Sequence, residues 1–298
     1  MLTFPLLKIL KEKFPGCSVH FLTKNNYVPL LQMNMAIDLI LSVETDDRKK
    51  QINEIRKEKY DLIIDLQNNL RSRFLTLFIN SRVKRYKKNN IKKFLLIITK
   101  INLLKNSPRI FQKYLRTIEI YLKNEDYEFE TSELEFDKKP LIKGDYIVVS
   151  PCSRHFTKTY PKEKFVQILN NFSEQKFVLV GANDKIERKI CNYIETNTNN
   201  VMNYCGKLNF EMLANVIYLS KSVISNDSGV MHFAEVLGKS VFAFFGSSVK
   251  EFGFFPNLPE SRVFEVKDLK CRPCSHIGKK DCPKKHFKCM NDIIPFFN

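Results

Sequence analysis

The chain has 298 residues, of which 44% are hydrophobic and 27% charged, and its formal net charge is +17. This composition excludes a disordered or fibrous protein, and the length is enough for two cores of about 140 residues each. The N-terminus lacks a basic leader with a small-residue cleavage site. The longest apolar stretch, residues 94–104, is interrupted by Lys100 and is too short to span a bilayer. We therefore expect a soluble, cytoplasmic protein.

The positive charge is concentrated in two clusters, and it favours partners that carry phosphate groups. Nucleic acid is one such partner, but the chain has no recognised nucleic-acid-binding module, so we expect it to bind none. Anionic lipid headgroups or a phosphorylated glycolipid are the other, since each basic residue near such a surface contributes roughly 1 kcal/mol. A coding preference for Lys and Asn is a third explanation for part of the charge. The clusters are Arg82, Lys84, Arg85, Lys87, Lys88, Lys92 and Lys93, and Lys279, Lys280, Lys284, Lys285 and Lys288.

In the first half of the chain, short apolar runs alternate with helical patterns. Such alternation is typical of parallel β–α–β units. A helix is expected to start near Leu70, and basic helical segments follow up to about Leu122. The other predicted helices are residues 6–14, 27–31 and 47–58, and the predicted strands are residues 18–22, a short one near Leu39, and residues 62–65.

Residues 123–145 are polar and acidic and include a proline and a glycine, which is typical of a linker. We expect a short strand at residues 134–136 within it, and a division of the chain into domains at residues 1–138 and 139–298. Strand–helix alternation then resumes. The predicted strands begin near Tyr146, Phe177, Val223 and Val241, and the predicted helices near Pro161, Asp184, Phe210 and Val230.

Residues 225–238 form the most informative local pattern. The β-branched run 221–224 leads into the turn Ser225-Asn226-Asp227-Ser228-Gly229, and a helical pattern and a second apolar strand follow. The free N–H groups and the positive dipole end of a helix that starts here would suit an anion such as the diphosphate of a nucleotide sugar. Locally, an ordinary turn in which Asp227 or Ser228 caps the helix remains an alternative.

The pattern D-S-G-x-x-H-x-A-x-x-L-G at residues 227–238, followed by a strand that ends in Phe-Gly, resembles the signature of a known family. That family is glycosyltransferase family nine, the bacterial ADP-heptose:lipopolysaccharide heptosyltransferases. Four further blocks resemble family blocks and occur in the same order along nearly the whole chain. They are residues 61–72, residues 146–151 with 158–161, residues 177–181 and residues 205–208.

The resemblance implies an α/β protein of the GT-B fold, with two Rossmann-like domains that face each other across a cleft. Residues 1–138 would form the acceptor-side domain, and residues 139–298 the donor-binding domain with a cysteine-rich tail. The implied enzyme is inverting, needs no metal or other cofactor, and moves heptose from ADP-heptose to the lipopolysaccharide inner core. We expect a monomer that attaches peripherally to the inner membrane, where its anionic glycolipid acceptor lies.

The same resemblance places six residues at the donor. The donor diphosphate and sugar hydroxyls would lie at the 227–238 motif, and Lys158 would offset the negative charge of the leaving group. Ordinary alternatives are a helix cap for Asp227, a core histidine for His232 and a solvated lysine for Lys158. The six residues are Ser153, Lys158, Asp227, Ser228, Gly229 and His232.

Acceptor recognition falls, by resemblance, on Arg71, whose guanidinium can hold a phosphate or carboxylate through two parallel hydrogen bonds; a surface arginine is the alternative. Family members normally begin with a strand and a Gly-Asp loop, and that aspartate is the proposed general base. This chain begins at Met1, just after the expected position, and its first carboxylate is Glu12. The base is therefore unassigned, and we expect the chain as written to bind donor but to transfer sugar poorly.

Four cysteines near the C-terminus follow the spacing C-x2-C-x7-C-x6-C, at Cys271, Cys274, Cys282 and Cys289. This spacing is compatible with a zinc site, with reduced thiols or with a disulfide. The similar tail of the family is not regarded as metal-dependent, so we assign no metal. For the whole chain, two alternatives remain open: the same fold with another nucleotide sugar, and a truncated, catalytically dead protein that binds a nucleotide sugar or glycolipid.

Overall fold

The computed structural model of the protein describes residues 1–43, 48–77, 79–122 and 127–297. Contacts within the chain divide it into two compact units. The C-terminal unit comprises Met1 and residues 91–107 and 136–298, and the N-terminal unit comprises residues 2–90 and 108–135. Among the described residues, no helix combines the length and the apolar character needed to cross a bilayer.

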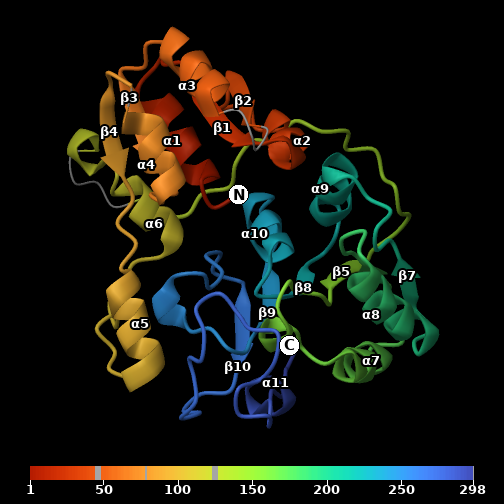
Figure 1. Ribbon diagram of the computed structural model, residues 1–298. Coiled ribbons are helices and arrows are strands. Elements are labelled where there is room, and N and C mark those ends of the chain that lie inside the picture. The colour runs from red at the N-terminus through yellow and green to blue at the C-terminus, as the bar shows by residue number, and fades with distance from the viewer. Residues whose placement is uncertain (44–47, 78, 123–126, 298) are drawn as a thin grey trace. The chain divides into compact units, whose positions relative to one another are not determined.

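The C-terminal unit is built on a six-stranded sheet in the order β10-β9-β8-β5-β6-β7, and every pair of neighbours runs parallel (Figure 1). Its central strands are almost entirely buried, as apolar strands covered on both faces should be. The strands are β5 (Ile147–Ser150), β6 (Phe177–Leu179), β7 (Val201–Asn203), β8 (Val223–Asn226), β9 (Val241–Phe245) and β10 (Arg262–Glu265).

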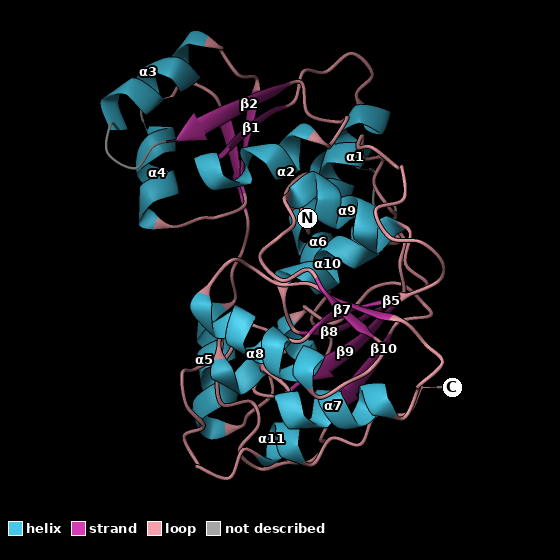
Figure 2. Cartoon of the chain, turned by 90° about the vertical axis from the view of Figure 1, so that its right-hand side faces the viewer, coloured by secondary structure: helices cyan, strands magenta, loops and turns pink. Residues whose placement is uncertain are grey.

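Helices cover both faces of this sheet: α7 and α8 lie on one side of the strands, and α9 and α10 on the other (Figure 2). Right-handed crossovers between parallel strands produce this arrangement when the chain moves first to one edge of the sheet and then to the other. The Asp184 carboxylate caps α8, and the Asn209 side chain caps α9. The helices are α7 (Lys162–Asn170), α8 (Lys185–Thr196), α9 (Phe210–Tyr218), α10 (Gly229–Val236) and the short α11 (Lys288–Asn291).

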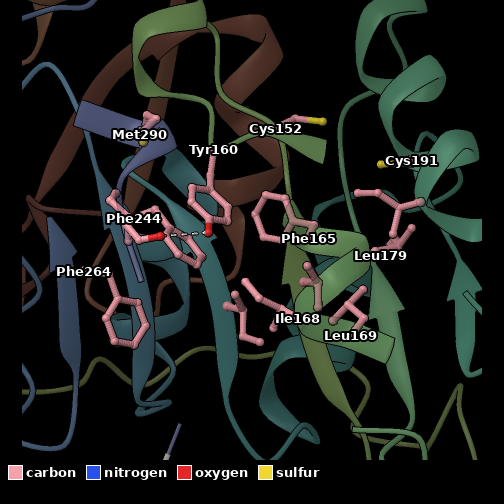
Figure 3. Packing of buried hydrophobic residues seen from close by; sticks show 14 of the residues in the cluster. Cys152, Tyr160, Phe165, Ile168, Leu169, Leu179, Cys191, Phe244, Phe264 and Met290 are labelled. Carbon is pink, nitrogen blue, oxygen red and sulfur yellow. Dashed lines mark hydrogen bonds between the residues drawn. The ribbon is translucent and has the colours of Figure 1, made fainter. Parts of the chain in front are cut away.

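Aromatic side chains dominate the core of this unit (Figure 3). The ring of Tyr160 stacks on that of Phe244 with centroids 4.0 Å apart, and Phe165 of α7 meets both rings edge-on. The Tyr160 hydroxyl donates to the carbonyl of Ile293 at 3.3 Å, and burial raises the pKa of Tyr160 to about 12. Because Tyr160 lies in the loop that follows β5, this packing fixes that loop to the sheet.

A segment from the first half of the sequence also belongs to the C-terminal unit. Residues 91–107, which include most of helix α5 (Asn90–Thr99), pack with it, and Leu96 and Leu104 form a buried cluster with Phe252. The helix is amphipathic, and only one of its faces takes part in this cluster.

The N-terminal unit contains two separate two-stranded parallel sheets, β1 with β2 and β3 with β4. Its core lies where α1 meets α6, with Leu6 and Ile9 packed against Phe111 and Leu115. The elements are α1 (Phe4–Lys13), β1 (His20–Lys24), α2 (Val28–Gln32), β2 (Leu39–Val43), α3 (Arg48–Lys57), β3 (Leu62–Asp65), α4 (Leu70–Leu77), β4 (Arg82–Arg85) and α6 (Ile110–Leu115).

Most predicted elements occur within a few residues of their expected bounds, and β3 has the predicted bounds. The pattern does not predict β4, which interrupts the expected helical segments, because its Arg-Val-Lys-Arg sequence has one apolar residue. It also misses β7 and β10, which are short strands at the two edges of the sheet. Instead of a strand at residues 134–136, the structure has a single antiparallel bridge between Leu134 and Asn34. The first residue of the predicted helix 47–58, and residues 123–126 of the predicted linker, lie outside the described residues.

Candidate functional site

Loops from three neighbouring strands meet at the carboxyl edge of the six-stranded sheet. β5, β8 and β9 are adjacent, and each leads into a polar loop: residues 151–161 after β5, residues 227–228 after β8 and residues 246–249 after β9. The carboxyl edge of an open parallel sheet is where ligands bind in α/β proteins. The predicted residues of the β5 and β8 loops therefore lie at the expected edge.

A buried ion pair joins two of these loops. Lys158 Nζ lies 2.7 Å from Asp227 Oδ2, and the two side chains are only 12% and 5% exposed. The hydroxyl of Ser248, from the loop after β9, donates to the same carboxylate oxygen at 2.7 Å. A buried carboxylate needs such partners, since an isolated charge would carry a large desolvation cost. Asp227 thus holds the Lys158 ammonium in a defined position.

Backbone contacts fix the three loops to one another. Asn226 Oδ1 accepts from the backbone N–H of Tyr160 at 2.9 Å, and the Thr157 carbonyl accepts from the N–H of Ser247 at 3.2 Å. Only glycine fits at position 246, because a Cβ there would lie 2.7 Å from the Thr157 carbonyl oxygen. The site is therefore organised by its scaffold before any ligand binds.

The N-terminus of α10 faces this edge without a side-chain cap among the described residues. Ser228 is the N-cap residue, but its hydroxyl lies 3.1 Å from that of Ser225 and caps no backbone N–H. Asp227 does not cap the helix either, since its carboxylate binds Lys158 and Ser248. The helix-cap alternative thus does not describe Asp227, and the first N–H groups of α10, which begins at Gly229, have no side-chain acceptor among the described residues.

Ser153 and His232 lie around the same loop. Ser153 Oγ donates to the Asp227 carbonyl at 3.3 Å. His232, one turn into α10, is 11% exposed, and its Nδ1 lies 3.8 Å from Glu235, whose carboxylate is occupied by Asn257 and Leu258. The structure therefore brings the six predicted donor residues into one region of the C-terminal unit.

Three buried polar atoms of this region have no hydrogen-bond partner among the described residues: Asn226 Nδ2, Ser247 Oγ and His232 Nδ1. Buried polar groups in native proteins are nearly always paired, so these atoms are suited to the polar groups of a ligand. The sequence motifs point to His232 but to neither Asn226 nor Ser247 as a ligand contact, nor to Ser248. The available signal was the Ser247-Ser248 pair, directly after an apolar strand that ends in Gly246.

Arg71 belongs to α4 in the N-terminal unit, whereas the predicted donor residues belong to the C-terminal unit. Asp65, at the end of β3, organises the start of this helix: it accepts from the N–H of Asn68 at 2.7 Å and from the Ser72 hydroxyl at 2.8 Å. The Nη2 atom of Arg71 is buried and has no hydrogen-bond partner among the described residues. Its donor is therefore suited to an anionic group of a ligand.

The cysteine-rich tail holds free thiols, as do the other cysteines of the chain. Cys271 Sγ lies 3.8 Å from Nε2 of His286, but no three His, Cys, Asp or Glu side chains of the described residues are arranged to hold a metal ion. Burial raises the pKa of Cys289 to about 12, so that this thiol stays protonated at neutral pH. The tail is anchored by packing, since Cys289 and Met290 lie in the core.

Comparisons with known proteins agree with this geometry. The family model of glycosyltransferase family 9 (heptosyltransferase) matches residues 48–285. The chain is 27% identical over 304 residues to lipooligosaccharide heptosyltransferase 2 of Campylobacter jejuni, with 98% of this chain and 89% of the relative covered. It is 22% identical over 329 residues to lipooligosaccharide heptosyltransferase 2 of Haemophilus influenzae, with 99% and 92% covered.

Solved structures of similar fold include E. coli ADP-heptose lps heptosyltransferase II, with a TM-score of 0.72, 18% identity, and coverage of 98% of this chain and 93% of that one. E. coli heptosyltransferase WaaC with ADP gives a TM-score of 0.69 at 15% identity, with 88% of each chain covered. At these sequence identities the structural similarity is evidence of the fold alone. It confirms the predicted α/β, GT-B fold class.

Proposed function

Because this chain belongs to glycosyltransferase family 9, we propose that it transfers heptose from ADP-heptose to the inner core of a lipopolysaccharide or lipooligosaccharide. The relatives that cover nearly all of the chain are lipooligosaccharide heptosyltransferases. The observation that carries the proposal most directly is the buried pair of Lys158 and Asp227 beside the uncapped start of α10. A fixed ammonium and free helix N–H groups are what a sugar-bound diphosphate requires.

The donor diphosphate would lie against the N-terminus of α10, with Lys158 beside it and the hydroxyls of Ser153 and Ser228 nearby. When the bond between the anomeric carbon and the phosphate oxygen breaks, negative charge develops on the departing ADP. Lys158 and the N–H groups of α10 would stabilise that charge, which is the role that a metal ion has in other transferases. Nδ1 of His232, which has no hydrogen-bond partner among the described residues, would bind a polar group of the donor.

The reaction would be a direct displacement. The acceptor hydroxyl oxygen attacks the anomeric carbon from the face opposite the diphosphate, so the configuration inverts, and ADP leaves with the bonding electron pair. The acceptor proton passes to a general base, which stays unassigned in this chain. Asp227 is not suited to that role, because Lys158 and Ser248 occupy its carboxylate.

The acceptor would be an anionic glycolipid at the surface of the inner membrane, and Arg71 would bind one of its phosphate or carboxylate groups. The unpaired Nη2 of Arg71 supports this assignment. In this scheme the N-terminal unit serves the acceptor and the C-terminal unit the donor. The protein acts as a cytoplasmic monomer that is bound peripherally to the membrane.

A thermal-shift titration with ADP-heptose, ADP, a UDP-sugar and a GDP-sugar tests the donor assignment. We expect saturable stabilisation by ADP-heptose and ADP, and a much weaker response to the other two. Transfer of radiolabelled heptose to heptose-deficient lipopolysaccharide then tests the reaction itself. A response only to UDP- or GDP-sugars would assign another donor, and donor binding without transfer would indicate a nucleotide-sugar-binding protein.

A further inference from the structure

Helix α5 exposes an apolar stripe. Ile91, Phe94 and Ile98 are 77%, 62% and 63% exposed, and their spacing of three and four residues places them on one face of the helix. Ile101 and Leu103, which follow the helix, are 56% and 53% exposed. We call these five residues the α5 stripe. Large apolar side chains that are exposed singly need no explanation, but a contiguous stripe marks an interaction surface.

The opposite face fixes α5 firmly to the C-terminal unit. Leu96 is buried against Phe252, and Lys100 Nζ donates to the carbonyl of Pro273 at 2.7 Å. Asn102 Nδ2 donates to Glu251 Oε1 at 2.8 Å. The α5 stripe therefore lies on a segment that is fixed by contacts with the C-terminal unit.

The charge around α5 is of one sign. Residues 66–118, which contain the whole segment, hold 14 Lys and Arg residues and no Asp or Glu. Lys92 lies within the helix and Lys105 just after the stripe, and both are exposed. The basic tail lies beside the C-terminal end of α5, since Lys100 also donates to the carbonyl of Cys271. The tail adds Ile277, which is 57% exposed, and Lys279, Lys280, Lys284 and Lys285.

We propose that the α5 stripe lies in the interface of an anionic lipid bilayer, with its apolar side chains among the acyl chains and the surrounding lysines at the headgroups. An apolar face bordered by basic residues is the pattern of helices that bind in the plane of a membrane. At ten residues, or about 15 Å, the helix is too short to cross the bilayer and so lies along it. The inference rests on the proposed function in that a glycolipid acceptor would bring the enzyme to such a surface.

Charge complementarity favours a lipid surface over a second copy of this chain. If two copies of the chain associated through the stripe, their two basic segments, which contain no Asp or Glu, would lie against each other and repel. An anionic bilayer instead gains from every lysine that it meets. Helix α4 is the competing surface within the chain, since Leu70 and Leu77 are 88% and 72% exposed.

Co-sedimentation with vesicles tests the proposal, and glutamine substitutions of the apolar residues leave the net charge unchanged. We expect the wild-type protein to bind vesicles of phosphatidylethanolamine with phosphatidylglycerol and to bind phosphatidylcholine vesicles weakly. Removing two inserted side chains in F94Q/I98Q should weaken binding at least roughly tenfold. The matched control is I186Q on α8, because Ile186 is 72% exposed in the same unit, and it should bind as the wild type does. K92Q/K105Q should weaken binding in a salt-dependent way.

Several outcomes would overturn the proposal. The first is that F94Q/I98Q binds vesicles as well as the wild type does. The second is that I186Q loses as much vesicle binding as F94Q/I98Q, or that L70Q/L77Q loses it instead. The third is a dimer in sedimentation velocity that F94Q/I98Q abolishes. The proposed function is tested separately with ADP-heptose binding and with transfer to a delipidated core acceptor in solution. Donor binding and transfer should both be unchanged in F94Q/I98Q. Heptose transfer can therefore be measured even if the α5 stripe does not bind membranes, and vesicle binding can be measured even if the protein transfers no heptose.

Discussion

Two ion pairs of similar length show how differently the two units use charge. In the N-terminal unit, Lys11 Nζ lies 2.6 Å from Asp38, and the side chains are 29% and 42% exposed. In the C-terminal unit, Lys158 and Asp227 lie 2.7 Å apart and are 12% and 5% exposed. A pair on the surface contributes little stability, and a buried pair is no better because desolvation offsets its attraction. The buried pair is thus better explained by the fixed cation that it provides than by stability.

The surrounding structure differs in the same way. The strands that lead to Lys158 and Asp227 are central in a six-stranded sheet and almost wholly buried. Among the described residues, the strands of the N-terminal unit pair two by two, and they are half-exposed over most of their length. In the proposed scheme, the rigid unit would bind the donor, and the less constrained unit would bind the acceptor.

The largest effect that the comparison predicts is on stability. Phe165→Ala removes a side chain that is 0% exposed and packs against Tyr160 and Phe244, so the free energy of unfolding should fall by about 3–5 kcal/mol. Leu77→Ala, in α4 of the other unit, removes a side chain that is 72% exposed and should change it by less than about 0.5 kcal/mol. Urea denaturation measures both, and equal losses would remove the contrast between the units.

The next effect is on donor affinity. Lys158→Ala removes the fixed cation, which should cost roughly 1.5–3 kcal/mol, or about tenfold to a hundredfold in the Kd for ADP-heptose. Asp227→Ala should have a similar effect, because Lys158 then loses its defined position. The control is Lys221→Ala, at the opposite end of β8, whose ion pair with Asp145 is exposed. Calorimetry that finds unchanged donor affinity in both Lys158→Ala and Asp227→Ala would refute the assignment of the donor site.

Arg71→Ala separates the roles of the two units. The KM for the glycolipid acceptor should rise about tenfold, while the Kd for ADP-heptose stays unchanged, because the lost contact is with the acceptor alone. Arg73→Ala is a control on the same helix: Arg73 is exposed and its Nε donates to Asn68. Steady-state kinetics and calorimetry give the two constants. A loss of donor affinity in Arg71→Ala would show that Arg71 does not act on the acceptor.

The smallest predicted effects concern pH, and they have opposite signs in the two units. Burial raises the pKa of Glu187 above that of an ordinary glutamate. Glu187 therefore stabilises the fold at a pH below the ordinary glutamate pKa, and this stabilisation is lost as the pH rises through the pKa in the folded protein. The hydrogen bond from Lys11 lowers the pKa of Asp38 below that of an ordinary aspartate. Asp38 therefore stabilises the fold at a pH above the ordinary aspartate pKa, and this stabilisation is lost as the pH falls through the pKa in the folded protein. Thermal melts should therefore show Glu187→Gln as relatively more stable at neutral pH, and Asp38→Asn as relatively less stable. The reverse signs would contradict the burial of Glu187 and the hydrogen bond from Lys11 to Asp38.

The sequence predicts the fold where local signals are strong. It predicts β3, the helices that begin near Asp184 and Val230, and the loops after β5 and β8, because apolar runs and turn residues mark the ends of buried elements. It misses β4, β7 and β10, since short strands with few apolar residues form only through pairing with a neighbour.

The details of the site depend on long-range contacts that no local pattern encodes. The contact of Lys158 with Asp227 joins residues far apart in the chain, and Ser248 enters from a third loop. The membership of α5 in the C-terminal unit likewise follows from the packing of Leu96 with Phe252, which sequence alternation does not reveal.

The most direct test of the central claim is a crystal structure of the protein with ADP-heptose. We predict that diphosphate oxygens lie within about 3 Å of Lys158 Nζ and of the first backbone N–H groups of α10, with Asp227 still paired to Lys158. Donor bound elsewhere on the C-terminal unit, or a diphosphate that contacts neither Lys158 nor the start of α10, would contradict it.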